Sequence, residues 1–350
     1  MNIQKDVYDE WGDLKDKKNK DLTTKELCVK KEKFNPLNSQ LFVSEYMDNN
    51  KALLLYHKIG SGKTCASILI ALRNTNRKHI YVITPASLID NYVTELCSPC
   101  GQNKYMTEKN YNLYMKNPNK NKNLMKNARE KINKHFTILS HHKFVKNAHK
   151  LKLGNSVIII DEVQNIISNK GKYYKIFYKY LHKAYLKKGT KIVLLTATPI
   201  YDKPDEIALT LNLLPIKNKI ETSNKFYNKY VSDKFRLKNG NLLKPKIQNL
   251  ISFYPGANKN AFPKVKHVNV YCKMSDFQWK TYRSILKKEG GFPDNPRSLN
   301  VNNYFYVNSR SVSNIAFPNK KLRNTGFKSF KIPHTKGYDL KQCSNKLWRV

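Results

Sequence analysis

The sequence has no long uninterrupted run of apolar residues. Its longest apolar stretches, such as Val157 to Ile160, are far shorter than the roughly 20 residues that cross a bilayer, so no membrane helix is expected. The first residues, MNIQKDVYDEWGDLKDKKNK, lack the apolar core of a secretory signal. The sequence therefore predicts a chain that stays in the compartment where it is made.

Cysteine is sparse as well. The six cysteines are scattered, with one C-x-x-C pair at Cys97 and Cys100 and no second pair at metal-ligand spacing. This pattern predicts free thiols in a reducing compartment. A zinc site would need ligands from elsewhere, such as His141 and His142, and surface or half-buried thiols are the simpler interpretation.

Acidic residues are few. Against 25 Asp and Glu stand 65 Lys and Arg, for a net charge of +40 over 350 residues. Such a surplus predicts attraction to polyanions, either nucleic acid or an anionic membrane. Most of it is lysine beside abundant Asn, Ile and Tyr, a composition that an AT-rich genome writes whatever the function. Charge alone therefore leaves the partner open.

The apolar residues that are present alternate with helical patterns. Short apolar runs at 52–56, 79–83, 136–139, 157–160 and 192–195 precede helical stretches at 64–73, 87–96, 141–149, 172–187 and 204–214. Parallel strands need crossover connections and are buried on both faces, so this alternation predicts an α/β fold with a parallel sheet and helices on both sides. Ligands of such sheets bind at the carboxyl ends of the strands.

Composition divides the chain further. We expect a charged tail over 1–33, a nucleotide-binding domain over 34–215 and an extension over 216–286. Residues 287–350 are expected to hold a linker, rich in Gly, Pro, Asn and Lys up to residue 338, and then the start of a further domain. Within the nucleotide-binding domain, the basic stretch 101–134 predicts an inserted loop or partly helical element. The extension is expected to be α+β, with strands at 250–254 and 268–271 and a helix that opens at Ser275, because Ser275 and Gln278 have capping-box spacing.

A phosphate-binding loop follows the first predicted strand. Gly60-Ser-Gly-Lys-Thr64 lies directly before a helix, an arrangement that turns backbone N–H groups and a helix N-terminus toward phosphate. Lys63 is expected to reach the β- and γ-phosphates, and Thr64 to bind Mg²⁺. The general P-loop pattern has glycine where this chain has His57. The predicted nucleotide-binding residues in this loop are His57, Lys58, Ile59, Gly60, Ser61, Gly62, Lys63 and Thr64.

Two further motifs follow later strands. Asp161-Glu-Val-Gln164 comes after the strand at 157–160, where Asp161 is expected to hold Mg²⁺ and Glu162 to orient and deprotonate the attacking water. Thr196-Ala-Thr-Pro199 follows the next strand. Each motif alone also fits an ordinary turn that caps a helix. Together they favour an NTPase, with Glu162 and Lys63 as catalytic residues.

These three motifs resemble motifs I, II and III of superfamily 2 helicases and translocases. Thr84-Pro-Ala-Ser-Leu88 with Asn91 resembles motif Ia, and Phe34 to Gln40 resembles the Q-motif region, with Gln40 as the adenine-reading candidate. His-x-x-Gly-x-Gly-Lys-Thr at 57–64 is similar to the helicase-like ATPases of large cytoplasmic DNA viruses, among them poxvirus early transcription factors and nucleoside triphosphatases. Weaker similarity lies in Ile251 to Gly256, at Phe262-Pro263 and in Met274 to Gln278.

The resemblance implies a RecA-like P-loop NTPase domain that uses ATP and Mg²⁺ and acts on nucleic acid, DNA before RNA. It assigns Gln164, Thr196 and Thr198 to coupling between nucleotide and nucleic acid. It also implies work in viral transcription or genome handling, alongside viral RNA polymerase machinery, in the host cytoplasm, a viral factory or the virion.

Family members bind ATP between two RecA-like lobes, and the second lobe supplies an arginine finger in a Q-x-x-G-R-x-x-R pattern. This sequence contains no such pattern, and Ser344-Asn-Lys346-Leu-Trp348 is similar to the segment that opens the second lobe. We therefore expect the first lobe only, completed in trans or by a longer parent chain.

Two other functions fit parts of the same evidence. One is a non-catalytic nucleic-acid-binding or assembly subunit that keeps the nucleotide cradle. The other is an unrelated P-loop enzyme such as a kinase, which the TATP motif and the Pro85 segment disfavour.

Overall fold

The computed structural model describes residues 34–76, 78–168, 171–216, 219–233, 236–255, 266–290, 306–329 and 339–349. They belong to two compact units, which divide between Pro263 and Lys264. The tail predicted at 1–33 and the Phe262-Pro263 similarity lie outside the described residues. Among those described, no helix is both long and apolar enough to cross a membrane.

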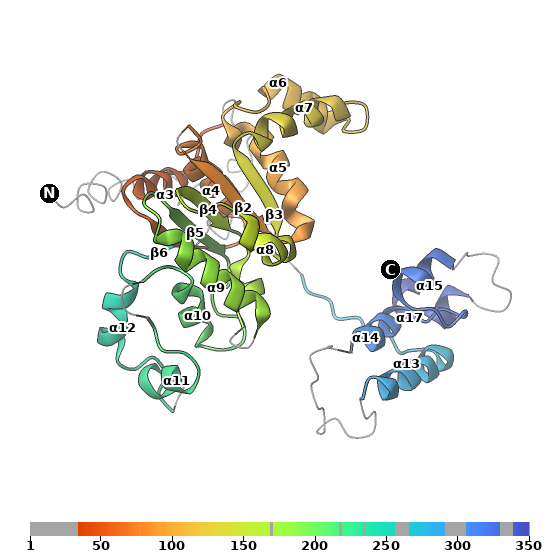
Figure 1. Cartoon of the computed structure of the whole chain (residues 1–350). Coiled ribbons are helices and arrows are strands. Elements are labelled where there is room, and N and C mark those ends of the chain that lie inside the picture. Colours follow the sequence, from red (N-terminus) through yellow and green to blue (C-terminus); the bar gives the residue numbers. More distant parts are fainter. Residues whose placement is uncertain are drawn as a thin grey trace. The chain divides into compact units, whose positions relative to one another are not determined.

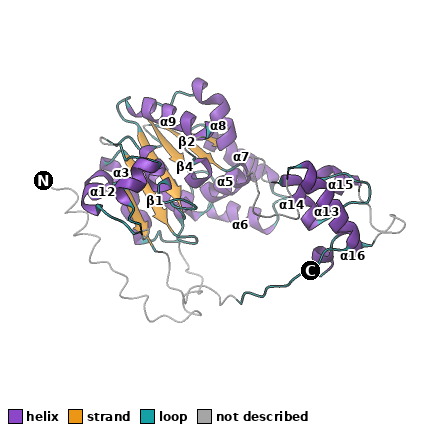
Figure 2. Ribbon diagram, turned by 90° about the horizontal axis from the view of Figure 1, so that it is seen from below, coloured by secondary structure: helices purple, strands orange, loops and turns teal. Residues whose placement is uncertain are grey.

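A six-stranded parallel sheet forms the centre of the first unit (Figures 1 and 2). The strand order is β3-β2-β4-β5-β1-β6, and every pair is parallel. The strands are β1 (Ala52–His57), β2 (His79–Thr84), β3 (Phe136–Ser140), β4 (Ser156–Ile160), β5 (Lys191–Thr196) and β6 (Ile251–Tyr254). The predicted α/β fold is confirmed.

Helices bury both faces of the sheet, because successive strand side chains point to opposite sides. Leu53 and Leu55 pack into one apolar cluster, whereas Leu54 packs into the other. The first cluster is covered by α3 (Asn38–Asn49), α4 (Lys63–Leu72), α5 (Ile89–Cys97) and α7 (Lys122–Asn133), and the second by α8 (His141–Asn147), α9 (Lys172–Tyr185), α10 (Glu206–Asn212) and α11 (Asn224–Tyr230). Short 3₁₀ turns η1 (Ala86–Leu88), η2 (Pro99–Gly101), η3 (Ala148–Lys150) and η4 (Val163–Ile166) join these elements.

The basic segment 101–134 is largely helical. It forms α6 (Glu108–Lys116) and α7, which lie together in Figure 1. Met125, Ala128 and Ile132 recur at helical spacing on α7 and are buried, so this helix packs against the sheet while its lysines stay outside.

The sheet extends beyond the predicted domain end at residue 215. After α12 (Gly240–Ile247), β6 from the predicted extension pairs with β1 along Leu54 to His57. The strand expected at 268–271 is absent; Val268 and Tyr271 are exposed in irregular chain, with no partner strand to pair their backbone.

The predicted extension over 216–286 contains both helices and the strand β6. The second unit is helical over its described residues 266–290, 306–329 and 339–349. It contains α13 (Asp276–Lys288), α14 (Val307–Asn314), α15 (Arg323–Ser329), α16 (Leu340–Cys343) and α17 (Asn345–Trp348). The helix predicted at Ser275 is confirmed: its Oγ accepts from the N–H of Gln278 at 3.0 Å. The Gln278 side chain does not close a capping box but donates to the Val312 carbonyl.

The linker predicted over 287–338 is wrong for α14 and α15, which are helical. Its apolar residues are few, but Val312, Phe317 and Cys343 are buried, and the Ala316 N–H donates to the Cys343 carbonyl at 2.9 Å. Convergence of distant residues is a tertiary property that a scan for dense apolar runs misses.

The cysteine prediction is wrong for one pair. Cys65 and Cys100 form a disulfide with a Cα–Cα separation of 5.5 Å, and Cys97, Cys272 and Cys343 are free. The two histidines considered as zinc ligands lie elsewhere: His141 contacts the Asp161 carbonyl and His142 the Tyr173 hydroxyl. Cys100 thus pairs with a cysteine 35 residues away rather than with Cys97.

Candidate nucleotide-binding site

The phosphate-binding loop runs from the end of β1 to the start of α4. Gly60 and Gly62 have φ angles of +77° and +74°, a left-handed conformation that strains any residue with a Cβ. Lys58, Ile59 and Gly60 are exposed, whereas Ser61 is buried. Glycine at these two positions is what allows the chain to turn tightly before the helix begins.

Lys63 and Thr64 occupy the first turn of α4 and are half-buried. The Lys63 ammonium lies over the loop and donates to the carbonyl of His57 at 2.9 Å and to that of Lys58 at 3.3 Å. Burial lowers the pKa of Lys63, while the negative charges of Glu162 and Asp161 raise it. The structure thus brings the loop lysine into electrostatic contact with the acidic pair.

Gln40 supports the loop from α3. Its Nε2 donates to the Gly62 carbonyl at 3.1 Å, its Oε1 accepts from the Leu37 N–H at 2.8 Å, and only 4% of the residue is exposed. A Cβ on Gly62 would collide with this amide. Gln40 therefore braces the phosphate loop; its reading of adenine stays a prediction.

His57 ends β1 beneath the loop. Its Nε2 lies 2.9 Å from the Ser252 Oγ of β6, and the side chain is buried. Burial, followed by repulsion from Lys63, lowers the pKa of His57 to about 4, so the imidazole is neutral near pH 7. The histidine that replaces the usual glycine thus serves as a neutral link between β1 and β6.

The acidic pair lies at the carboxyl end of β4. Asp161 is 7% exposed; its Oδ2 accepts from Thr84 Oγ1 at 3.2 Å and its Oδ1 from the Glu162 N–H at 3.0 Å. Burial, together with the adjacent Glu162, raises the pKa of Asp161 to about 6, although Thr84 and Lys63 oppose the shift. His141 donates to the Asp161 carbonyl at 2.9 Å. Asp161 is held rigidly and is poised to gain from a nearby cation.

A hydrogen-bonded chain joins the second motif to the third. The Gln164 amide donates to the Glu162 carboxylate, and its Oε1 accepts from Thr196 Oγ1 at 2.7 Å. Thr196 Oγ1 accepts in turn from the Thr198 N–H at 3.0 Å. Thr196 is fully buried and Thr198 is exposed, so the chain leads from the acidic pair to the surface.

Sequence reasoning missed Ser252 and His141 as supports of the site and did not foresee that Thr84 bonds Asp161. Thr84 and His141 directly follow or end strands β2 and β3, so the same strand-end rule that found the motifs would have flagged them. Ser252 gave no such signal, because its role depends on β6 pairing beside β1.

The model of the SNF2-related domain matches residues 38–332, most of the chain. This chain belongs to the SNF2-related domain family. The "Putative ATP-dependent RNA helicase R563" of Acanthamoeba polyphaga mimivirus is 36% identical over 307 residues, covering 83% of this chain and 53% of that protein. The "Early transcription factor 70 kDa subunit" of Yaba monkey tumor virus is 27% identical over 274 residues, which cover 72% of this chain and 39% of that protein. The predicted resemblance to viral helicase-like ATPases is confirmed.

The SNF2-related chain spans about half or less of each of these two relatives. Among solved structures, the SWI2/SNF2 ATPase core of Sulfolobus solfataricus in complex with dsDNA matches 71% of this chain and 50% of that one, at 18% identity and a TM-score of 0.43.

Proposed function

We propose that this chain is the ATP-binding lobe of a nucleic-acid-dependent ATPase of helicase or translocase type, which serves viral transcription or genome handling. The observation that carries the proposal is the hydrogen-bonded chain from the acidic pair to the surface, with the nucleotide loop lysine close enough to feel the charge of that pair. Lys63 lies near the acidic pair, Glu162 bonds Gln164, and Gln164 bonds Thr196. Such a chain lets the state of the acidic pair alter the exposed end of the third motif.

The residues of the loop fit a bound triphosphate. Ser61 Oγ is buried without a hydrogen-bond partner among the described residues, which suits a phosphate oxygen as acceptor. The Lys63 ammonium donates hydrogen bonds to two carbonyls of the loop and can exchange them for hydrogen bonds to phosphate oxygens. The loop backbone and the α4 N-terminus add partial positive charge at the same place.

Thr64 and Asp161 fit Mg²⁺, which prefers oxygen ligands and, when bound, neutralises charge on the phosphates. The raised pKa of Asp161 marks a buried carboxylate that lacks a sufficient cation. Glu162, half-buried beside it and fixed by Gln164, is in place to orient and deprotonate the attacking water.

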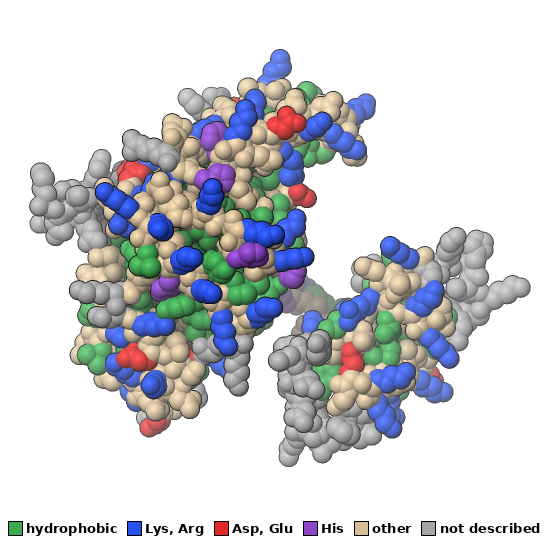
Figure 3. All heavy atoms as spheres, in the orientation of Figure 1, with side chains coloured by type: hydrophobic (Ala, Val, Ile, Leu, Met, Phe, Trp, Pro, Cys, Tyr) green, Lys and Arg blue, Asp and Glu red, His purple; other side chains and the backbone are tan. Residues whose placement is uncertain are grey.

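Charge supports nucleic acid as the partner. Figure 3 shows lysine and arginine side chains spread over the displayed face with few acidic ones between them, in keeping with the net charge of +40. We propose DNA, in preference to RNA, as the nucleic acid that the chain binds. We also propose that a second RecA-like lobe, in trans or in a longer parent chain, supplies the arginine finger. The cytoplasmic location and the association with viral polymerase machinery are part of the same proposal.

The test measures ATP hydrolysis by the chain, supplied with a second RecA-like lobe, with and without single- and double-stranded DNA and RNA. We expect nucleic-acid-stimulated turnover that Lys63→Ala and Glu162→Gln abolish and that Lys51→Ala, an exposed lysine before β1, leaves unchanged. Turnover equal in all variants would overturn the assignment of these residues.

A second candidate is a non-catalytic subunit that keeps the nucleotide cradle but does not hydrolyse ATP. Arginine fingers increase the turnover rate about 10³- to 10⁵-fold in related phosphoryl-transfer enzymes. Mg²⁺-dependent ATP binding that Lys63→Ala abolishes, without turnover even when a second lobe is supplied, would establish this candidate instead.

A further inference from the structure

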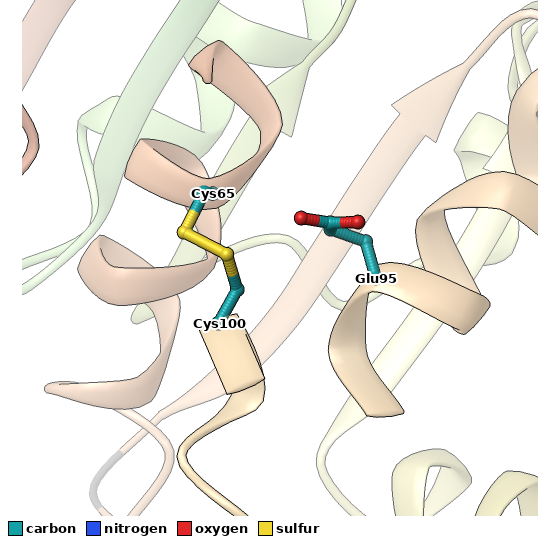
Figure 4. A group of neighbouring side chains, drawn as sticks. All are labelled: Cys65, Glu95 and Cys100. Carbon is teal, nitrogen blue, oxygen red and sulfur yellow. A yellow bond between two sulfur atoms is a disulfide. The ribbon is translucent and has the colours of Figure 1, made fainter. Parts of the chain in front are cut away.

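Three side chains of types that bind metals gather near the start of α4, the helix that follows the phosphate loop. Cys65, Glu95 and Cys100 place their ligand atoms within 4.8 Å of one another (Figure 4). They come from three elements: the first turn of α4, the C-terminal part of α5 and η2. Both sulfurs are buried and the carboxylate is half-buried.

The carboxylate is the unexplained member of this group. Figure 4 shows Glu95 pointing toward the two sulfurs, and no lysine or arginine among the described residues forms an ion pair with it. Burial alone raises the pKa of Glu95. A disulfide offers a carboxylate neither charge nor hydrogen-bond donors, so the sulfur–sulfur bond gives no reason for its position.

We propose that Cys65, Cys100 and Glu95 form a zinc site when the Cys65–Cys100 disulfide is reduced, with water as the fourth ligand. Two thiolates and one carboxylate are a donor set that Zn²⁺ accepts in tetrahedral geometry. At Zn–S distances near 2.3 Å the two sulfurs lie about 3.8 Å apart, a span that the 5.5 Å Cα–Cα separation allows. The half-exposed carboxylate side gives the ion and its water a path from solvent.

The two states exclude each other chemically. Two equivalents of a monothiol such as glutathione supply two hydrogens and two electrons, break the sulfur–sulfur bond and become a disulfide themselves. Zn²⁺ then displaces the two thiol protons and the carboxyl proton, where one is present. A reducing compartment favours the thiol form and therefore the metal.

Cys97 is not part of the site although it completes the C-x-x-C pattern. It lies in the apolar cluster with Met125 and Ile132, outside the group of three ligand atoms. Cys97 is thus a matched control, three residues from a proposed ligand and equally buried.

The site lies behind the nucleotide loop. Cys65 directly follows Thr64, and a metal there ties the first turn of α4 to α5 and η2. The inference is independent of ATP hydrolysis and is tested without it.

The experiment strips the full chain of metal, reduces it with a phosphine and titrates it first with Co²⁺ and then with Zn²⁺. We expect a one-to-one cobalt complex with a thiolate-to-metal absorption band, which Zn²⁺ displaces. Cys65→Ser and Cys100→Ser should each abolish the band, and Glu95→Gln should weaken binding at least about tenfold. Cys97→Ser and Cys272→Ser should leave it unchanged.

A second measurement needs no variant. Zn²⁺ should protect Cys65 and Cys100 of the reduced wild-type chain from alkylation, as mapped by mass spectrometry, while Cys272 continues to react. The proposal is overturned by the lack of a one-to-one complex, by a complex that survives Cys65→Ser with Cys100→Ser, by loss of the complex in Cys97→Ser, or by a disulfide that the phosphine does not open in the folded chain.

Discussion

At the scale of single residues, the candidate site is built from groups whose surroundings change their ordinary chemistry. Asp161 is a carboxylate that burial makes reluctant to ionise, and His57 is an imidazole that burial keeps neutral. Thr196 is a hydroxyl with no access to water that serves two hydrogen bonds at once. Burial accounts for all three, because the exposed fractions are 7% for Asp161, 1% for His57 and 0% for Thr196.

His57 predicts a loss of stability in acid. Its folded pKa of about 4 lies below the ordinary value of 6.5, so the unfolded chain takes up the proton first as pH falls. The contribution of neutral His57 to the free energy of unfolding is present above pH 6.5 and is lost as pH falls toward 4. His57→Gln, which keeps a polar partner for Ser252, should remove this dependence. We expect wild type to lose roughly 2–3 kcal/mol relative to the variant by about pH 4.5.

Urea unfolding of both chains from neutral pH to about pH 4.5 measures this difference. Asp161 titrates in part of the same range with the opposite sign, which is why the comparison uses the difference between two chains that share it. A constant difference across the range would show that His57 does not carry the effect.

The position of Thr196 predicts a role in coupling ATP hydrolysis to nucleic acid but not in ATP binding. Thr196→Val keeps the buried volume but removes the hydroxyl that joins Gln164 to Thr198. We expect ATP affinity to stay near that of wild type while stimulation of hydrolysis by nucleic acid falls about tenfold. Thr94→Val, which loses a helix-surface bond to the Asp90 carbonyl, is the control and should leave stimulation intact. Equal stimulation in the wild type, Thr196→Val and Thr94→Val would show that the third motif takes no part in coupling.

At the scale of elements, the nucleotide loop is braced from both sides. Helix α3 holds it through Gln40 and Gly62, and β6 holds the preceding strand through Ser252 and His57. A strand that joins the sheet from residues 251–254 therefore stabilises a loop almost 200 residues earlier, since the two hydrogen-bonded side chains are separated by 195 positions in the sequence. Loop and sheet edge should respond together to substitutions at this contact.

Gly62 tests the brace. Alanine at this position combines left-handed strain of about 1–2 kcal/mol with a collision against the Gln40 amide. Gly290 also has a positive φ, of +80°, but a Cβ there meets no atom within 4 Å. We expect Gly290→Ala to show the strain alone, and Gly62→Ala to be less stable still and to bind ATP more weakly. Thermal unfolding and nucleotide titration measure both; matching results for the two variants would argue against the brace.

At the scale of the whole molecule, the surplus of positive charge bears on the binding to nucleic acid that we propose. A net charge of +40 implies that binding to nucleic acid releases condensed counterions. With about six phosphate contacts, affinity for duplex DNA should fall roughly a thousandfold between about 50 mM and 200 mM salt.

Fluorescence anisotropy with a labelled duplex measures this dependence, and ATP affinity at the same salt concentrations reports whether the fold is intact. Affinity for DNA that does not change with salt would contradict a phosphate-dominated interface.

Much of the site could be predicted because its chemistry is local in sequence. Glycines at 60 and 62 with Lys63 and Thr64, the pair Asp161 and Glu162, and the threonines at 196 and 198 each follow an apolar strand. Parallel strands bring their carboxyl ends to one edge, so recognition of the strands is enough to bring these residues together. The sheet, its helical layers and the motif positions followed from short-range patterns.

Only the tertiary structure decided which distant residues meet. The pairing of β6 with β1, the Gln40 brace, the bond from His141 to Asp161 and the convergence of Cys65, Glu95 and Cys100 all join segments with no shared local pattern. The same holds for the helices past residue 306, where Val312, Phe317 and Cys343 are buried although the local sequence has few apolar residues. Periodicity reports which face of an element is apolar, whereas the partner of that face is chosen by packing of the whole chain.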